Sequence, residues 1–257
     1  MSTVTVNSVA ALTKALAVAH AGDTIQLAPG TYSNVSVYKL NFATPVTITS
    51  QDPKHAAVIS GLSVYNSTGV TFSQLAVSTS GALNTWSTKV GGSDQVLFSH
   101  VDFLGSKTTA PSSQASALLI QNSSNIGVQS SHFAYVNTGV TELNNSYVRI
   151  AGNAFDHIGT DGIDNGGSSN VTIANNSFTN FQNTVGTNHP DAIQFWTVNT
   201  TTSPHDITIS GNVFARGSGT LAQGIFMTDE VGLPEESASD NAAVELTNFV
   251  AMAGPAL

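Results

Sequence analysis

Short stretches of alternating apolar and polar residues recur along the chain, and each ends in a small polar pair and a phenylalanine. The five clearest stretches are VLFSHVDF (96–103), IGVQSSHF (126–133), VRIAGNAF (148–155), VTIANNSF (171–178) and ITISGNVF (207–214). Alternation with a period of two is typical of β-strands, and repeats of roughly 20 to 50 residues are typical of solenoids. The pattern therefore predicts an all-β fold, a right-handed parallel β-helix in which each repeat forms one coil.

A second set of short apolar segments precedes these stretches. Its members are ALLIQN (117–122), GVTEL (139–143), GIDNGG (162–167), AIQFWT (192–197) and GIFMTD (224–229). Parallel strands of stacked coils pair in register, so equivalent residues form columns. One inward column is expected to contain Val140, Ile163, Ile193 and Ile225. The turn residues Asn153, Asn176 and Asn212 also fall at equivalent positions, which predicts a ladder of buried amides.

Both ends of a solenoid need a cap, because an open coil exposes apolar core and unpaired strand edges. At the start, Ser8 is a suitable N-cap for a helix over about 8–21 that ends before Gly22. At the far end, apolar spacing over 237–254 predicts a second helix that covers the last coil. The predicted organisation is a β-helix with its N-terminal cap over 1–234 and a C-terminal capping segment over 235–257.

Composition excludes several classes of function. The 257 residues include only 7 Lys and Arg against 16 Asp and Glu, for a formal net charge of -9. Nucleic acid is bound through clustered cations, so a nucleic-acid partner is not expected. There is no cysteine, which removes disulfides, cysteine-ligated zinc and cysteine nucleophiles. The sequence contains neither a membrane span nor a signal peptide of the usual pattern.

Acidic residues concentrate in two adjacent predicted coils, in FDHIGTDGIDNGG (155–167) and TNHPDAIQFWT (187–197). The predicted register places Asp161 beside Asp191 and Asp164 beside Gln194. Carboxylates this close raise one another's pKa, which creates the acid and base pair that glycosidic cleavage uses. This wall of the solenoid is therefore the predicted site.

Residue roles at this site follow from residue type. The predicted catalytic residues are Asp161, Asp191, His189 and His157. The predicted substrate-binding residues are Asp164, Gln194, Trp196 and Arg216, with Trp196 as an outward platform for a sugar ring. A calcium ion held by Asp161, Asp164 and Asp191 is a further expectation. The alternative interpretations are a turn role for Asp161, backbone capping by Asp191, and a core position for Trp196 if the register shifts by one residue.

Several segments resemble known families. AHAGDTIQLAPGTYSN and PVTITSQDPKHAAVISG resemble the opening coils of chondroitinase-B-like and alginate-type polysaccharide lyases. TDGIDNGGSSNVTIANNSF resembles the NTDGID-type motif of polygalacturonase-like glycoside hydrolases, which implies a role for Asp161, and HPDAI falls where those enzymes carry paired aspartates. Only Asp191 of that pair is present, and AQGIF replaces their Gly-His-Gly element. The coils are also similar to those of mannuronan C5-epimerases, without their Asp-Pro-His-Glu motif.

These resemblances imply a secreted or cell-surface protein of bacterial type that acts on a polysaccharide. Our first expectation is a carbohydrate-active enzyme of the lyase or C5-epimerase type that cleaves or remodels a uronate-containing polysaccharide. His189 or His157 would be its base, with Arg216 or calcium neutralising the uronate carboxylate. The first alternative is an inverting glycoside hydrolase in which Asp161 and Asp191 divide the acid and base roles. The second is a non-catalytic β-helix for glycan binding or adhesion.

Overall fold

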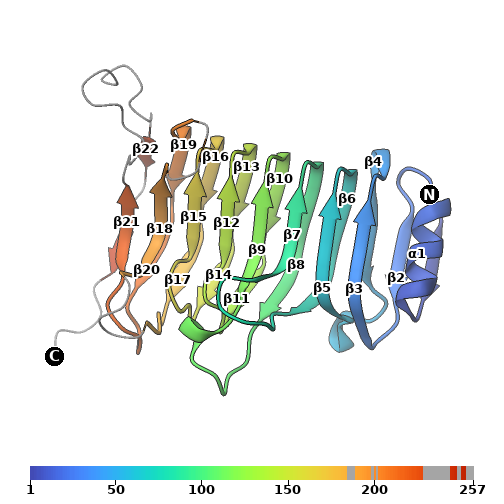
Figure 1. Ribbon diagram of the computed structural model, residues 1–257, viewed down its shortest axis with the longest axis horizontal. Coiled ribbons are helices and arrows are strands. Elements are labelled where there is room, and N and C mark those ends of the chain that lie inside the picture. Colours follow the sequence, from blue (N-terminus) through green and yellow to red (C-terminus); the bar gives the residue numbers. More distant parts are fainter. Residues whose placement is uncertain (184–188, 198–199, 201, 228–243, 248–249, 253–257) are drawn as a thin grey trace.

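The computed structural model describes residues 1–183, 189–197, 200, 202–227, 244–247 and 250–252. The described residues form an elongated stack of coils with a helix at the N-terminal end (Figure 1). Every strand pairing among them is parallel. This arrangement confirms the predicted parallel solenoid.

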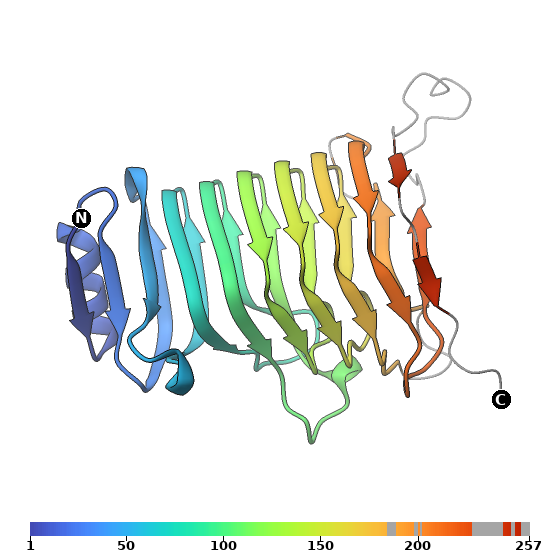
Figure 2. The same ribbon diagram turned by 180° about the vertical axis from the view of Figure 1, so that it is seen from behind.

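In the described residues, the strands form three walls along the stack, seen from opposite sides in Figures 1 and 2. The first wall contains β3 (Thr31–Tyr38), β5 (Val58–Tyr65), β7 (Trp86–Gly91), β9 (Ser116–Gln121), β12 (Val140–Leu143), β15 (Ile163–Gly166), β18 (Asp191–Trp196) and β21 (Gln223–Met227). The second contains β1 (Thr3–Val6), β2 (Thr24–Leu27), β4 (Asn41–Ser50), β6 (Thr68–Ser78), β8 (Asp94–Leu104), β10 (Ser124–Gln129), β13 (Ser146–Ala151), β16 (Ser169–Ala174), β19 (His205–Ser210) and β22 (Val244–Thr247). The third contains the C-terminal parts of β6 and β8 with β11 (His132–Ala134), β14 (Ala154–Asp156), β17 (Ser177–Thr179), β20 (Val213–Ala215) and β23 (Val250–Met252). Short 3-10 turns, η1 (Pro53–His55) and η2 (Pro111–Ser113), interrupt two of the loops.

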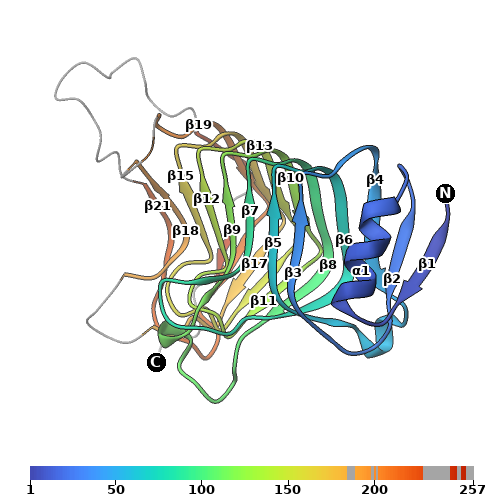
Figure 3. The same ribbon diagram turned by 45° about the vertical axis from the view of Figure 1, so that its right-hand side comes forward.

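Helix α1 (Val9–Val18) covers the first coil, as predicted (Figure 3). The Ser8 side chain accepts a hydrogen bond from the backbone N–H of Ala11 at 3.2 Å, which satisfies an otherwise unpaired donor at the helix start. Leu12 and Leu16 are buried against the end of the core. The helix therefore closes the apolar end of the solenoid.

The C-terminal helix predicted over 237–254 is wrong where the structure describes that segment. β22 and β23 are strands that pair with β19 and β20, with Val244 opposite Ile207 and Leu246 opposite Ile209. The alternation of Val244 and Leu246 repeats that of the isoleucines before it, so these residues extend the ladder instead of leaving it. The other residues of the predicted helix, and the predicted boundary after residue 234, lie outside the described residues.

The repeats are held in register by their interior. The five repeat phenylalanines form a continuous ring stack with centroid separations of 4.6, 4.8, 4.7 and 5.2 Å. This stack contains Phe103, Phe133, Phe155, Phe178 and Phe214. Offset stacking of buried rings adds to the stabilisation from their burial. Any slip of one coil would break the stack, so the interior fixes which outward residues become neighbours.

The predicted asparagine ladder is also present. The backbone N–H of Asn153 donates to Oδ1 of Asn176, and that of Asn176 donates to Oδ1 of Asn212, both at 2.9 Å. Each amide nitrogen in turn donates to a carbonyl of an adjacent coil. Since buried polar groups need partners, this ladder holds the turns between the second and third walls at fixed height.

Candidate functional site

Asp161 and Asp191 lie side by side at the start of β15 and β18. The backbone N–H of Asp191 donates to Oδ1 of Asp161 at 2.9 Å, and the N–H of Gly162 donates to the carbonyl of Asp191 at 2.9 Å. A Cβ on Gly162 would lie 2.5 Å from the Ala192 carbonyl and 2.7 Å from the Phe178 ring. Only glycine permits this close approach of the coils. The sequence thus brings the two aspartates together through a glycine and a shared repeat position.

The outer wall continues this arrangement along the two strands. Asp164 pairs with Gln194 and Gly166 pairs with Trp196, which is the predicted register. A Cβ on Gly166 would collide with the Trp196 ring, so the indole lies directly over that glycine. The half-buried ring of Trp196 covers the wall at the opposite end of β18 from Asp191.

Burial dominates the electrostatics of the three aspartates. Asp161, Asp164 and Asp191 are 8%, 6% and 0% exposed. Burial raises the pKa of Asp161 to about 7, and the Asp191 charge adds to the rise, against the hydrogen bond from the Asp191 N–H and the charge of His189. Burial, with the charges of Asp161 and Asp191, also holds the pKa of Asp164 well above its usual range. In the described part of the chain, Oδ1 of Asp164 and Oδ1 of Asp191 are buried without a hydrogen-bond partner.

His189 is the exposed member of the cluster. Its Nδ1 lies 3.0 Å from Oδ2 of Asp191, and its side chain is 57% exposed while that of Asp191 is fully buried. The imidazole also contacts the Phe226 ring, with centroids 5.0 Å apart. Burial raises the pKa of Asp191, and the hydrogen bond and charge of His189 oppose that rise. A carboxylate on Nδ1 orients an imidazole and leaves Nε2 available to accept a proton.

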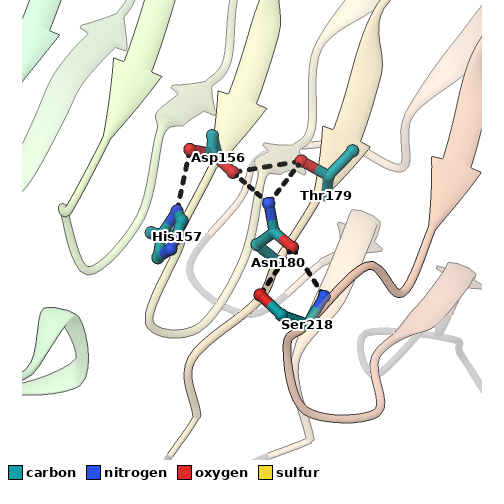
Figure 4. Close-up of polar contacts among 5 residues, drawn as sticks. All are labelled: Asp156, His157, Thr179, Asn180 and Ser218. Carbon is teal, nitrogen blue, oxygen red and sulfur yellow. Dashed lines mark hydrogen bonds and ion pairs between the residues drawn. The ribbon is translucent and has the colours of Figure 1, made fainter.

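His157 belongs to a different cluster, shown in Figure 4. Its Nδ1 lies 2.7 Å from Oδ2 of Asp156, and its ring stacks on Tyr135 with centroids 4.6 Å apart. Asn180 and Thr179 donate to Oδ1 of Asp156 at 2.7 and 3.1 Å. Burial alone would raise the pKa of Asp156, but the donors outweigh it and lower the pKa. Among the described residues, no hydrogen bond or ion pair joins His157 to the three aspartates; its contacts are with Asp156 and Tyr135.

Arg216 also lies apart from the aspartates. It follows β20, and its Nε donates to the carbonyl of Gly219 at 3.2 Å. No ion pair with an aspartate is found for it within the described residues. It lines a pocket together with Phe181 and Gln182.

Residues 60–189 match the sequence pattern of a family described as the right handed beta helix region. The chain belongs to this β-helix family. The match ends at His189 and includes the strand that carries Asp164. No curated protein matches the sequence. Within the described residues, no helix has the length and apolar character needed to cross a membrane.

Solved structures similar to this β-helix share its fold at low identity. A lacto-N-biosidase from Eubacterium ramulus has a TM-score of 0.60 at 12% identity, over 86% of this chain and 52% of the other. A rhamnogalacturonan lyase has a TM-score of 0.57 at 12% identity, over 84% and 67%. The surface protein and adhesin PfbA from Streptococcus pneumoniae has a TM-score of 0.57 at 15% identity, over 91% and 79%. The chain thus spans about half of the lacto-N-biosidase, and these likenesses establish the fold alone.

Two residues at the aspartate wall were not predicted. Thr141 on β12 lies opposite Asp164 and forms a hydrogen bond with it that opposes the rise of its pKa. Trp86, from β7, donates its Nε1–H to Oγ1 of Thr141 at 3.3 Å. The alignment of GVTEL with GIDNGG places Thr141 beside Asp164, so this neighbour could be predicted from the sequence. No local signal identifies Trp86, because its side chain reaches a coil that is distant in sequence.

A buried polar pair behind the wall was also missed. Glu142 and Asn165 are 0% exposed, in the inward column next to Ile163, and Nδ2 of Asn165 lies 3.5 Å from Oε1 of Glu142. Burial raises the pKa of Glu142 to about 8, against the hydrogen bond from Asn165. The inward position of Glu142 could be predicted from the sequence, because it lies two positions after the inward Val140 and every second residue of a strand faces inward.

The predicted calcium site is not supported by the geometry. Among the described residues, no group of three or more histidine, aspartate or glutamate side chains is arranged to hold a metal ion. Oδ1 of Asp161 already accepts the Asp191 N–H, and Oδ2 of Asp191 already faces His189. The side chains therefore do not fit a calcium ion.

Proposed function

We propose that this β-helix protein is a carbohydrate-active enzyme that hydrolyses a glycosidic bond, with Asp161 as the acid and the Asp191–His189 pair as the base. The observation that carries the proposal is the contact between two unlike groups. Asp161 is a buried carboxyl group with a pKa of about 7, and it is hydrogen-bonded to the residue whose carboxylate holds His189. Paired groups whose environments separate their proton affinities are typical of acid and base catalysts.

Asp161 supplies the proton for the leaving group. With a pKa of about 7, a large share of this carboxyl group remains protonated near neutral pH. Transfer of its proton to the glycosidic oxygen allows the bond to the anomeric carbon to break, and leaves Asp161 as a carboxylate. The buried setting that raises its pKa therefore prepares it for this role.

His189 accepts the second proton. A water molecule attacks the anomeric carbon and transfers a proton to Nε2 of His189, while the Asp191 carboxylate on Nδ1 stabilises the imidazolium that forms. Exchange with solvent then returns the proton to Asp161 and removes it from His189. Trp196, lying over Gly166 on the same wall, gives a sugar ring further along the strand an aromatic surface.

Hydrolysis fits this site better than the elimination or epimerisation expected first. Those reactions remove a proton beside a uronate carboxylate, which needs a cation or metal at that carboxylate. In the described residues, no lysine or arginine forms an ion pair with the three aspartates, and Arg216 is turned to a separate pocket. The base and the acid are thus present without the neutralising group.

The test is incubation with a panel of neutral, carboxylated and sulfated polysaccharides. We expect new reducing ends from at least one of them without the ultraviolet absorbance of unsaturated ends, and loss of the activity in Asp161→Asn. Asp206→Asn is the matched control, because Asp206 also pairs with a histidine but is exposed on β19. Unsaturated products would identify a lyase instead. Glycan binding without any product would contradict the enzyme proposal.

A further inference from the structure

A pocket lies where three segments meet on the edge between the third and first walls. It has a volume of about 330 Å³ and is lined by Ala110, Pro111, Ser112, Phe181, Gln182, Asn183, Arg216, Ser218, Gly219 and Thr220. The first of these residues belong to the loop between β8 and β9, which projects from the lower edge of the stack in Figure 1. This volume is at the lower end of the range for small-molecule sites, which suits one sugar unit.

We propose that this pocket binds an anionic group, a carboxylate or a sulfate, on a sugar that flanks the cleavage point. The proposal rests on the proposed function, because it names the class of glycan that the aspartate wall would cleave. Arg216 would hold the anion through its terminal guanidinium nitrogens, since its Nε is already occupied by the carbonyl of Gly219 at 3.2 Å. Charge-assisted hydrogen bonds from arginine to carboxylate or sulfate are among the stronger polar contacts.

The pocket is held in shape by its own hydrogen bonds. Oδ1 of Asn180 accepts from the backbone N–H of Ser218 at 2.8 Å and from its hydroxyl at 3.2 Å, as Figure 4 shows. The Thr220 hydroxyl donates to the carbonyl of Phe181 at 3.0 Å and accepts from the N–H of Asn183 at 3.1 Å. A turn fixed in this way loses little conformational entropy when a ligand binds.

The local charge favours an anion despite the acidity of the whole chain. The protein has a formal net charge of -9 and only 7 Lys and Arg. Arg216 is exposed at the pocket, and Lys107 lies in the same projecting loop, with its ammonium 5.4 Å from the Tyr135 ring centroid. The nearby carboxylate of Asp156 is occupied by Asn180 and other donors. In an acidic protein, such a local cation determines where an anionic ligand can bind.

Backbone hydrogen bonds between successive turns connect the pocket to the turn that carries Asp161. The N–H of Thr220 donates to the carbonyl of Phe181, and the N–H of Gln182 donates to that of Ile158, both at 2.7 Å. Ile158 lies three residues before Asp161 in the same turn. Successive coils are about 4.8 Å apart, so the turn of Arg216 is about 10 Å along the stack from that turn. This separation corresponds to a few sugar units of an extended glycan.

The inference is tested by titration calorimetry in the Asp161→Asn background, which prevents turnover. The probes are trigalacturonate, a sulfated chondroitin tetrasaccharide, its desulfated form and neutral cellotriose. We expect Arg216→Ala to weaken binding of at least one acidic probe about tenfold or more and to leave cellotriose unaffected. Arg216→Lys should recover part of the loss. Arg149→Ala, an exposed arginine on β13, is the matched control and should bind like the parent.

The probes separate the possible sources of the anion. If Arg216→Ala loses affinity for trigalacturonate, the anion is a carboxylate. If Arg216→Ala loses only the advantage of the sulfated tetrasaccharide over its desulfated form, the anion is a sulfate. Equal binding of the acidic probes by parent and Arg216→Ala would overturn the inference. So would a parent that binds no acidic probe more tightly than cellotriose. Retained hydrolysis in Asp161→Asn would instead contradict the proposed function, independently of these binding results.

Discussion

The protein contains two aspartate–histidine pairs in neighbouring parts of its coils, and the pKa of the aspartate is shifted in opposite directions in them. In the Asp191–His189 pair, Oδ2 of the aspartate and Nδ1 of the histidine are 3.0 Å apart, and burial raises the pKa of the aspartate. In the Asp156–His157 pair, the corresponding atoms are 2.7 Å apart, and hydrogen bonds lower the pKa of the aspartate. The same two residue types thus form one pair with high proton affinity and one with low proton affinity.

The number of hydrogen-bond donors explains the difference. Asp156 accepts from Asn180 and Thr179 as well as facing His157, so its negative charge is stabilised although the residue is partly buried. Asp191 has a buried Oδ1 without a partner in the described part of the chain. An aspartate with many donors has a lowered pKa, whereas a buried aspartate with few donors, such as Asp191, has a raised pKa that only His189 opposes.

The largest effect is expected when the proton of Asp161 is removed from the site. Asp161→Asn should lower turnover about 10²- to 10⁴-fold, because a general acid contributes about that much. The asparagine Oδ1 can still accept the Asp191 N–H, so the variant should fold. Initial rates on the hydrolysed glycan measure the effect, with the exposed Asp206→Asn as control. Rates within about threefold of the parent would remove Asp161 from the mechanism.

Replacement of the histidine should affect turnover differently in the two aspartate–histidine pairs. His189→Gln should reduce turnover by about 10²-fold, because it removes the exposed base held by Asp191. His157→Gln should leave turnover nearly unchanged, because its ring contacts Tyr135 and Asp156 away from the aspartate wall. Single-turnover rates of the two variants are the measurement. Equal losses in both would contradict the assignment of the base.

Glu142 allows a test of how burial with a single long hydrogen bond affects stability. Its pKa is raised to about 8 in the fold from 4.5, so the fold loses stability as pH rises between these values. Glu142→Gln removes that ionisation and should be more stable than the parent above pH 8 by on the order of 5 kcal/mol, because each pKa unit corresponds to about 1.4 kcal/mol. Denaturant unfolding at pH 5 and pH 8.5 tests this. A parent whose stability is equal at both pH values, or a variant stabilised equally at both, would contradict it.

Asp156 should show the opposite pH dependence with a smaller effect. Its lowered pKa means that the stability it contributes is present above the unfolded value of 3.8 and is lost as pH falls through the folded pKa. Asp156→Asn should destabilise the protein by about 1 kcal/mol at pH 7, because it removes charge-assisted hydrogen bonds. Thermal unfolding of parent and variant at pH 7 and pH 3 measures this. A stability difference that grows on acidification would contradict the donor argument.

Much of the fold follows from the sequence, because the interior repeats itself. The phenylalanine at the end of each repeat fixes the register, and Asp161 and Asp191 occupy the same repeat position, so their contact could be predicted. The predicted C-terminal helix was wrong where the structure describes it, because the apolar residues of VELTNFV have spacings that fit short strands as well as a helix. Parallel pairing with the coil before it favours the strands.

The positions of His157 and Arg216, away from the three aspartates, have a different origin. His157 is only four residues from Asp161 in sequence, but its backbone adopts a left-handed conformation, with φ of 54°, at a corner where the ring meets Tyr135. Arg216 follows Phe214 by two residues, as His157 follows Phe155, and the next residue, Gly217, has a left-handed backbone with φ of 57°. Strand residues inherit their positions from the ladder, whereas residues at corners and in loops depend on local backbone geometry and on contacts with distant segments.

Asp161 is expected to hold a proton near neutral pH, whereas Asp156 is expected to be ionised. Titration of the aspartate carboxyl carbons by NMR measures this directly, with Asp161→Asn and Asp156→Asn used to assign the signals. We predict a pKa of about 7 for Asp161 and a pKa below 3.8 for Asp156. An Asp161 signal that titrates near 4, in the range of an ordinary aspartate, would contradict the account.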